Sequence, residues 1–198
     1  MLSPEAWTAL AAWVTALATI VLVWFTLMAV RWQAKEQRAL HAVDLALRLS
    51  DRFTSAEMRW HRQQLSTMLI QGPLPAGANE SSRRILDFFD TIGVLVGNGM
   101  LSTESAWSDF WWDAGHYHEA LAPRILWIRA QHGNDPTLHS DFDDLFRRLL
   151  EYESTMRKIP VAQAQPTPAA VTAFLQSETA LAVAPPLGVS TTATSSGR

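Results

Sequence analysis

The sequence predicts an all-α protein with one N-terminal transmembrane helix, a small antiparallel helical bundle and a disordered C-terminal tail. Three observations predict this architecture. Residues 6–30 carry no charged side chain, and about 20 apolar residues suffice to span a hydrocarbon core of about 30 Å. Between residues 31 and 158, apolar side chains recur at the three- and four-residue spacing of helices. From residue 159 the chain is rich in Pro, Ala, Ser and Thr, which is typical of flexible segments.

Composition excludes several classes of function. The 198 residues leave room for one domain and an anchor. With a formal net charge of −3 the chain offers no general attraction for DNA or RNA, so we expect no nucleic-acid partner. Cysteine is absent, which excludes disulfides, thiolate metal sites and cysteine nucleophiles.

The first predicted element is the transmembrane helix at residues 6–30. Ser3 can cap its start, and Pro4 suits the first helical position, where its missing N–H would have stayed unpaired. The apolar run is too long for a cleaved signal peptide, and no Lys or Arg precedes it. Trp7 and Trp32 lie near the two expected membrane interfaces.

Orientation follows from the basic residues Arg31, Lys35 and Arg38, which come directly after the span. Such residues stay on the cytoplasmic side of a membrane. We therefore expect residues 1–5 outside the cytoplasm, the rest of the chain inside it, and the lipid bilayer of a cell inner membrane as the first partner.

One face of the span is small and slightly polar. It consists of Thr8, Ala12, Thr15, Thr19 and Thr26. Small residues let helices approach closely, so this face is a candidate for pairing with another span. The alternative is that each threonine hydroxyl bonds to a carbonyl of its own helix, which we favour because no Gly-x-x-x-Gly is present.

Residues 31–53 are predicted to form a basic amphipathic stem helix. Its apolar side carries Leu40, Val43, Ala46, Leu47, Leu49 and Phe53. No Gly or Pro interrupts the chain between the span and Gly72, so span and stem can be one helix. Thr54 and Glu57 form a capping box for the next helix.

Residues 54–158 are predicted to form the helical domain. The clearest core stripe consists of Ile85, Phe88, Phe89, Ile92, Leu95 and Val96. Asn98 and Gly99 end that helix, because both tolerate a left-handed backbone, and Ser102 caps the next. Trp107, Phe110, Trp111, Ala114 and Leu121 line the inward side of the next helix. Pro123 either kinks that helix or starts a new one.

The last predicted helix begins at Ser140. Its inward side carries Phe142, Leu145, Phe146, Leu149 and Met156. Asp141, Asp143 and Asp144 lie in its first turn, where acids favour the helix dipole. No Gly-containing loop with a closing Glu follows, so we prefer this interpretation to a calcium site. Residues 159–198 are predicted to be a flexible tail, in which residues 169–184 have the composition to form a transient helix.

These features resemble a bacterial family of short one-pass membrane proteins known only as a domain of unknown function. The shared features are the span, the basic stem, the helix RILDFFDTIGVL at residues 84–95, the turn GMLS at residues 99–102, the aromatic helix at residues 107–117 and Arg124. The resemblance covers about residues 5–155 and consists of packing motifs. It implies the architecture, and it implies no catalytic residue.

One cluster has the residue types of a chemical site. It comprises Asp113, His116, Tyr117, His118 and Glu119. The two histidines lie about 200° apart on a helix, so both cannot face one metal ion without a local break. Trp112 and Tyr117 are instead candidates for a partner surface, because aromatic residues are enriched in protein contacts. The alternative is ordinary packing between helices.

We therefore expect a membrane-tethered helical interaction module without catalytic, cofactor or metal residues, whose partner is another protein or a second copy. Two alternatives stay open. One is a membrane-acting effector in a stress or defence response that works through oligomerised spans. The other is a metal-dependent hydrolase using His116 or His118.

Overall fold

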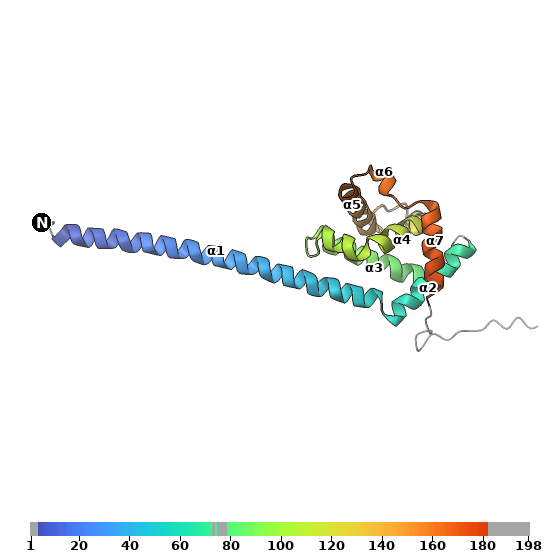
Figure 1. Cartoon of the computed structure of the whole chain (residues 1–198), viewed down its shortest axis with the longest axis horizontal. Coiled ribbons are helices and arrows are strands. Elements are labelled where there is room, and N and C mark those ends of the chain that lie inside the picture. Colours follow the sequence, from blue (N-terminus) through green and yellow to red (C-terminus); the bar gives the residue numbers. More distant parts are fainter. Residues whose placement is uncertain (1–3, 73, 75–78, 182–198) are drawn as a thin grey trace, which may run out of the picture. The chain divides into compact units, whose positions relative to one another are not determined.

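The computed structural model describes residues 4–72, 74 and 79–181 (Figure 1). These residues form seven helices and no strand, which confirms the predicted all-α class. Within the helices, the side chains of residues 4–12, 14–18, 20 and 34–40 lie outside the description. The helices are α1 (Pro4–Phe53), α2 (Ala56–Gln71), α3 (Glu80–Gly97), α4 (Thr103–Gln131), α5 (Ser140–Arg157), α6 (Val161–Ala164) and α7 (Pro168–Thr179).

The chain divides into two compact units, Met1–Asp44 and Leu45–Arg198. The described part of the first unit belongs to α1, which continues without a break through the predicted span and stem. The second unit holds the last turns of α1 and the helical bundle, so residues 45–53 of the predicted stem belong to the domain. Among the residues whose side chains the structure describes, which within residues 6–30 are 13, 19 and 21–30, no helix is long and apolar enough to cross a membrane.

The junction between α1 and α2 differs from the predicted capping box by one residue. The Ser55 hydroxyl, and not that of Thr54, accepts a hydrogen bond from the Met58 N–H at 3.2 Å and caps α2. Thr54 instead donates its hydroxyl hydrogen to the Ser50 carbonyl at 2.9 Å, which satisfies an end of α1. The prediction was wrong because both neighbouring hydroxyls suit a cap, and only the path of the chain decides between them.

The core of the second unit is built on α3, which packs mainly against α5 and also contacts α2 and α4. The predicted apolar stripe of α3 is confirmed, since Ile85, Phe88, Phe89 and Ile92 are fully buried. Phe89 stacks on Phe142 of α5 with a centroid separation of 5.0 Å. Aromatic side chains bury large apolar areas and stack with defined geometry, so they set how these helices pack.

The predicted boundaries of α3, α4 and α5 agree with the structure. Asn98 caps the end of α3, and Gly99 follows it with a φ of 67°. The Ser102 hydroxyl accepts from the Ser105 N–H at 3.0 Å and starts α4. Pro123 lies inside α4 and starts no new helix. α5 begins at Ser140, as predicted.

One inward position on α5 was predicted wrongly. Phe142, Leu145, Phe146 and Leu149 are buried, whereas the Met156 side chain is 55% exposed. The buried stripe of α5 ends one turn earlier, at Glu153, whose carboxylate accepts a hydrogen bond from the Trp107 indole N–H at 2.8 Å.

The prediction of a flexible tail from residue 159 was wrong for residues 161–164 and 168–179, which form α6 and α7. The Thr167 hydroxyl caps α7, and Pro168 occupies its first turn. Phe174 and Leu175 are buried in the core of the domain, and α7 packs against α2 and α4. Composition suggested flexibility because the few large side chains of this segment are diluted among Ala, Ser, Thr and Pro. Residues 182–198 of the predicted tail lie outside the described residues.

α3 and α5 approach each other closely at Gly93. A Cβ atom at this position would lie 2.1 Å from the backbone oxygen of Asp141, so no larger side chain fits without a shift of one helix. Glycine is used where backbones come this close.

This contact gives a stability prediction. Gly93→Ala should lower the free energy of unfolding by about 3 kcal/mol, because the added methyl group forces two packed helices apart. The matched control is Gly97→Ala at the end of the same helix, where an added Cβ meets nothing within 4 Å. It should leave stability unchanged or raise it by up to about 1 kcal/mol. Urea unfolding followed by circular dichroism measures both, and equal effects would contradict the packing argument.

Candidate functional site

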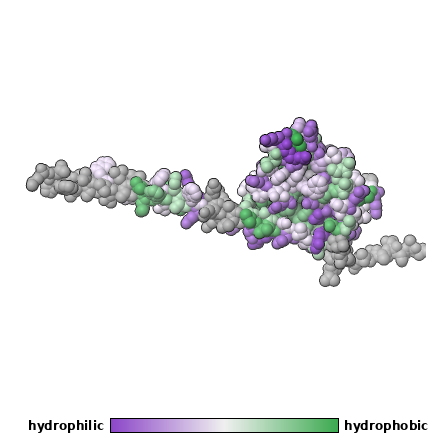
Figure 2. All heavy atoms as spheres, viewed as in Figure 1, coloured by the Kyte–Doolittle hydropathy of each residue, from purple (hydrophilic) through white to green (hydrophobic). Residues whose placement is uncertain are grey.

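The first candidate surface is the described stretch of α1 at residues 21–33. Every side chain in it is exposed in a single chain, and Figure 2 shows hydrophobic side chains gathered on α1. The exposed fraction ranges from 44% at Met28 to 68% at Leu22 among its aliphatic residues. Apolar surface left in water costs about 25 cal/mol per Å², so this stretch suits an apolar environment.

The residues predicted to lie at the membrane interfaces are only partly described. Arg31 is exposed, and the Trp32 side chain is 70% exposed. The side chains of Trp7, Lys35 and Arg38 lie outside the described residues. The end of the apolar stretch therefore carries a cationic side chain, Arg31, next to an amphipathic one, Trp32.

The predicted threonine face is also partly described. Thr19 and Thr26 are exposed, while the side chains of Thr8, Ala12 and Thr15 lie outside the described residues. The Thr26 hydroxyl donates to the Leu22 carbonyl at 2.8 Å. At this position the hydroxyl therefore bonds to its own helix, which was the alternative to bonding across a pair of spans.

Of the two residues of the predicted partner surface, Trp112 is exposed and Tyr117 is buried. The Trp112 side chain is 62% exposed and packs against His116 with ring centroids 4.1 Å apart and ring planes tilted by 48°. Tyr117 is completely buried, because it lies about 140° around the helix from Trp112 and faces α7. Trp112 is thus the exposed end of a row of aromatic rings that continues through His116 to Phe174 of α7.

His116 and His118 contact different neighbours. The Nδ1 atom of His116 lies 2.6 Å from the Trp112 carbonyl, and Nε2 of His118 lies 3.0 Å from a carboxylate oxygen of Asp143. A carbonyl and a carboxylate only accept, so these two nitrogens carry the hydrogens. The two rings stack on Phe174 and Phe146 respectively. Both histidines therefore pack helices together and do not converge on one position.

A buried ion pair joins α2 and α7. Arg62 donates to both carboxylate oxygens of Glu178, from Nε at 2.7 Å and from Nη2 at 2.6 Å. Tyr117 donates its hydroxyl hydrogen to Glu178 at 2.8 Å, and Asp113 lies 3.2 Å from Arg62. The guanidinium also lies 4.0 Å from the centroid of the Phe53 ring. Such two-pronged charged hydrogen bonds are strong and directional.

The environment shifts the pKa values in this network. Burial raises the pKa of Asp113 to about 6, and the charge of Arg62 opposes that shift. Burial lowers the pKa of Arg62, but the hydrogen bond and charge of Glu178 outweigh it, so that the pKa is raised. Burial and the neighbouring Glu178 raise the pKa of Tyr117. Arg62 therefore stays charged, and Tyr117 stays a hydrogen-bond donor.

Sequence analysis missed this network because Arg62 and Glu178 lie far apart in the chain and Glu178 fell in the predicted tail. One signal was present. Glu178 is the only charged residue between Lys158 and Arg198. If a segment with one charge packs into a core, that charge is buried only when it is paired.

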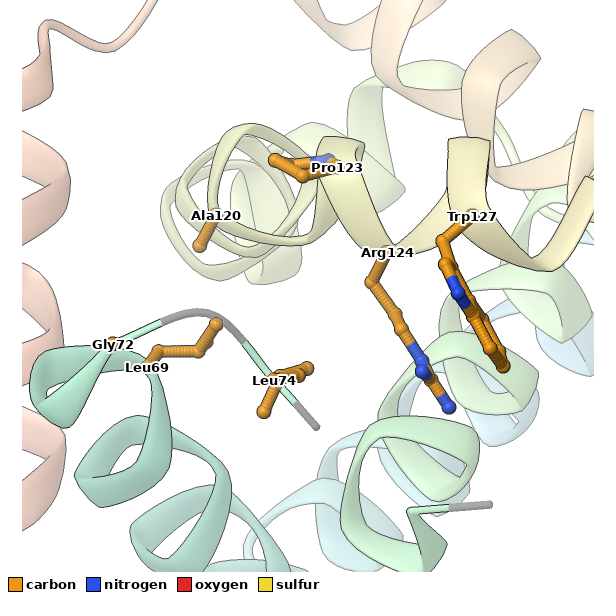
Figure 3. Close-up of a pocket in the computed structure, with 7 residues that line it drawn as sticks. All are labelled: Leu69, Gly72, Leu74, Ala120, Pro123, Arg124 and Trp127. Carbon is orange, nitrogen blue, oxygen red and sulfur yellow. The ribbon is translucent and has the colours of Figure 1, made fainter. Parts of the chain in front are cut away.

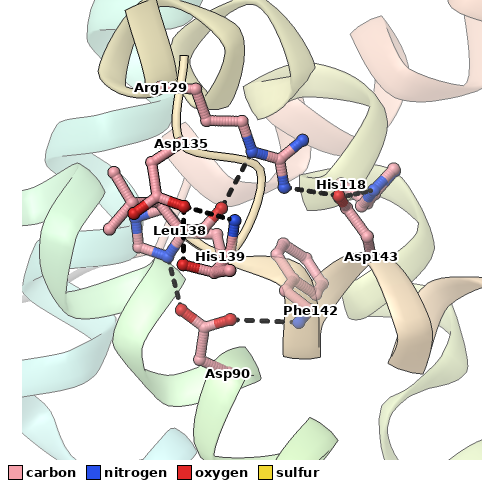
Figure 4. A network of polar contacts seen from close by, with 9 residues as sticks. Asp90, His118, Arg129, Asp135, Leu138, His139, Phe142 and Asp143 are labelled. Carbon is pink, nitrogen blue, oxygen red and sulfur yellow. Dashed lines mark hydrogen bonds and ion pairs between the residues drawn. The ribbon is translucent and has the colours of Figure 1, made fainter. Parts of the chain in front are cut away.

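A second polar network joins α3, α4 and the start of α5 (Figure 4). Asp90 accepts hydrogen bonds from the His139 ring and, at 3.0 Å, from the backbone N–H of Phe142. Asp90 thus takes the role of a cap for α5. On the other side, Asp143 pairs with Arg129 of α4 and with His118.

The acidic residues of the first turn of α5 therefore have separate tasks. Asp143 pairs with Arg129 and His118, Asp144 pairs with Arg147 at 2.9 Å, and Asp141 is exposed. Among the residues that the structure describes, no group of three or more His, Cys, Asp or Glu side chains is placed to hold a metal ion.

A cavity lies where the end of α2 and the following Leu74 face α4 (Figure 3). Its volume is about 380 Å³, and its described lining is Leu69, Gly72, Leu74, Ala120, Pro123, Arg124 and Trp127. The Arg124 guanidinium lies 4.3 Å from the centre of the Trp127 ring system, and burial lowers its pKa. No residue of this lining is a nucleophile or an ordinary proton donor. The cavity suits an apolar side chain or ligand beside one cation.

The ion pair of α2 and α7 gives a second stability prediction. Glu178→Gln keeps the shape of the side chain but removes the charge that faces Arg62. It should lower the free energy of unfolding by about 3 kcal/mol, as for a broken buried pair. Glu151→Gln is the matched control, since Glu151 pairs at 3.6 Å with Arg147 and both are more than half exposed. It should cost less than about 1 kcal/mol. Urea unfolding compares them, and similar losses would contradict a special role for Glu178.

Asp113 gives a pH prediction. Its folded pKa of about 6 exceeds the ordinary 3.8, so the folded state favours the neutral acid. The stability this provides is fully present below pH 3.8 and is lost as the pH rises through 6. Relative to Asp113→Asn, the wild-type chain should lose up to about 3 kcal/mol of unfolding free energy between pH 4 and pH 7. Unfolding measured at several pH values tests this, and a constant or growing difference would refute it.

Comparison with known proteins assigns no relative to this chain. No protein family model, no curated protein and no solved structure matches it.

Proposed function

We propose that this chain is a membrane-tethered helical interaction module that performs no chemistry. The first part of α1 anchors it in a lipid bilayer, and the helical domain binds a protein partner or a second copy. The architecture that we proposed by resemblance, a short one-pass bacterial membrane protein, belongs to the same proposal.

The observation that carries the proposal is the run of 25 uncharged residues at positions 6–30, which lies within the single helix α1. A run of this length spans a hydrocarbon core of about 30 Å. Its described side chains at residues 21–30 are all exposed in one chain. Lipid is the solvent that suits them best.

The basic flank supports an orientation. Arg31, Lys35 and Arg38 follow the run directly, whereas residues 1–5 contain neither Lys nor Arg. Basic residues close to a span stay in the cytoplasm. We therefore propose that residues 1–5 face out of the cytoplasm and that the domain lies inside, at a cell inner membrane.

Two features of the domain support binding over catalysis. The Trp112 side chain is 62% exposed although it belongs to a packed helix, and exposed tryptophan is enriched in protein contacts. The cavity beside Arg124 and Trp127 is lined mainly by apolar groups. The buried carboxylates and histidines of both polar networks already bind other side chains or the backbone, so they hold helices together.

The anchor gives a testable prediction. The full-length chain should sediment with membranes and resist extraction by high salt, and Leu22→Arg should release much of it. Arginine in the centre of a span costs about 2.5 to 3.5 kcal/mol in insertion. Leu126→Arg is the matched control, because Leu126 of α4 is 63% exposed and Leu22 is 68% exposed, but only Leu22 lies in the run.

Membrane fractionation of the wild-type chain and the two variants tests the anchor. The control should remain in the membrane fraction, and protease added outside sealed cells should leave the domain intact. A wild-type chain recovered from the soluble fraction without detergent would overturn the anchor, and a domain digested from outside would overturn the orientation.

A further inference from the structure

One face of α1 carries a seven-residue repeat along most of its length. Counting from Thr8, one position of the repeat is occupied by Thr8, Thr15, Leu22, Ala29, Glu36 and Val43. The other is occupied by Ala12, Thr19, Thr26, Gln33, Leu40 and Leu47. We call these twelve positions the seam. A repeat spaced by three and four residues is the pattern through which two helices wind around each other.

The seam side chains that the structure describes are all exposed in the single chain. In the first unit, Leu22 is 68% exposed and Val43 is 59% exposed. In the second unit, Leu47 is 61% exposed. Val43 and Leu47 lie beyond the apolar run, where water and not lipid surrounds the helix, so exposed aliphatic groups there call for a protein neighbour.

Within the second unit, α1 turns one side to the core of the domain and another side to solvent. Leu49 and Phe53 are buried in the core. They lie about 200° and 240° around the helix from Leu47. Folding of the domain therefore leaves Leu47 exposed. The bulky Trp13 and Trp24 also lie off the seam, so the positions that would face a second helix within the run are mostly small.

We propose that the seam of one chain packs against the seam of a second copy, in parallel and in register. This inference rests on the proposed function, because two copies anchored in one membrane by the same run must point the same way. The pair begins within the bilayer and continues into the stem. Thr and Ala allow close approach in lipid, and Leu40, Val43 and Leu47 supply the apolar contact in water.

Gln33 is the reason to choose a second copy as the occupant. It is a polar residue at one of the two core positions of the repeat. An amide side chain both donates and accepts, so two Gln33 side chains that meet across a parallel pair can satisfy each other. A polar side chain at a core position can set the register of identical helices. Thr26 bonds to its own helix, so pairing within the run depends on packing.

Glu36 limits the strength of the pair. In register it meets Glu36 of the other chain, and like charges at a core position repel. The position lies close to Arg31 and Lys35 in sequence, outside the apolar run, where water and cations moderate the repulsion. The seam is thus suited to a reversible pair rather than a permanent one.

The chain is well suited to a cross-linking test because it contains no cysteine. A single introduced cysteine can form a disulfide only with another copy, and only where two Cα atoms come within about 7 Å. We compare Val43→Cys on the seam with His41→Cys off it. Both positions are exposed in the single chain and lie two residues apart, so their access to an oxidant is matched.

Each variant is expressed as the full-length chain, its membranes are isolated, and a mild oxidant is added before electrophoresis without reductant. We expect a product of twice 22.1 kDa for Val43→Cys, at least five times more abundant than for His41→Cys. Equal yields, or no product from either variant, would overturn the paired seam. A cross-linked product of another mass would assign the seam to a different protein and overturn self-pairing.

The same experiment separates this inference from the proposed function. Recovery of the wild-type chain in the membrane fraction tests the anchor alone. An anchored chain without cross-links at Val43 refutes the pair and leaves the anchor intact. A soluble chain refutes the anchor, and cross-links at Val43 but not at His41 would then support the seam by itself.

Discussion

The ion pair between Arg62 and Glu178 is the contact on which the form of the domain depends. Both side chains are buried, and they come from α2 and α7, at opposite ends of the domain sequence. A buried charge without a partner costs several kcal/mol. If α2 and α7 separated, the charge that stayed buried would lose its partner. Phe53 at the end of α1 lies under the guanidinium, and Tyr117 of α4 donates to the carboxylate. Four helices therefore meet at a single pair of charges.

The described large apolar side chains of the two units differ in their exposure to solvent. The domain hides its large side chains between helices, with Phe88, Phe89 and Phe142 fully buried. The described part of α1 does the reverse and presents aliphatic and aromatic groups such as Leu22 and Trp24 to its surroundings. A bilayer and a second helix are the two environments that cover such a surface. This contrast, and not any reactive group, motivates the role that we propose.

Sequence patterns predicted the parts of the fold that depend on neighbours in the chain. The apolar stripe of α3, the cap at Ser102 and the turn at Gly99 each involve residues within one or two helix turns. Their spacing and backbone preferences are visible in the sequence. The two residues of the candidate partner surface show the same distinction. Trp112 is exposed, as predicted, and Tyr117 is buried. α7, which the sequence analysis placed in a flexible tail, packs against Tyr117.

The sequence alone determined that the chain is helical, where its amphipathic stripes lie and that a run of 25 uncharged residues precedes a basic flank. These properties follow from local spacing and composition. Only the tertiary structure decided that α7 belongs to the core, that Asp90 caps α5, and that Gly93 must be glycine. Each of these depends on a contact between segments far apart in the chain. The contribution of such residues to stability comes from contacts with distant segments, and the local sequence does not reveal those contacts.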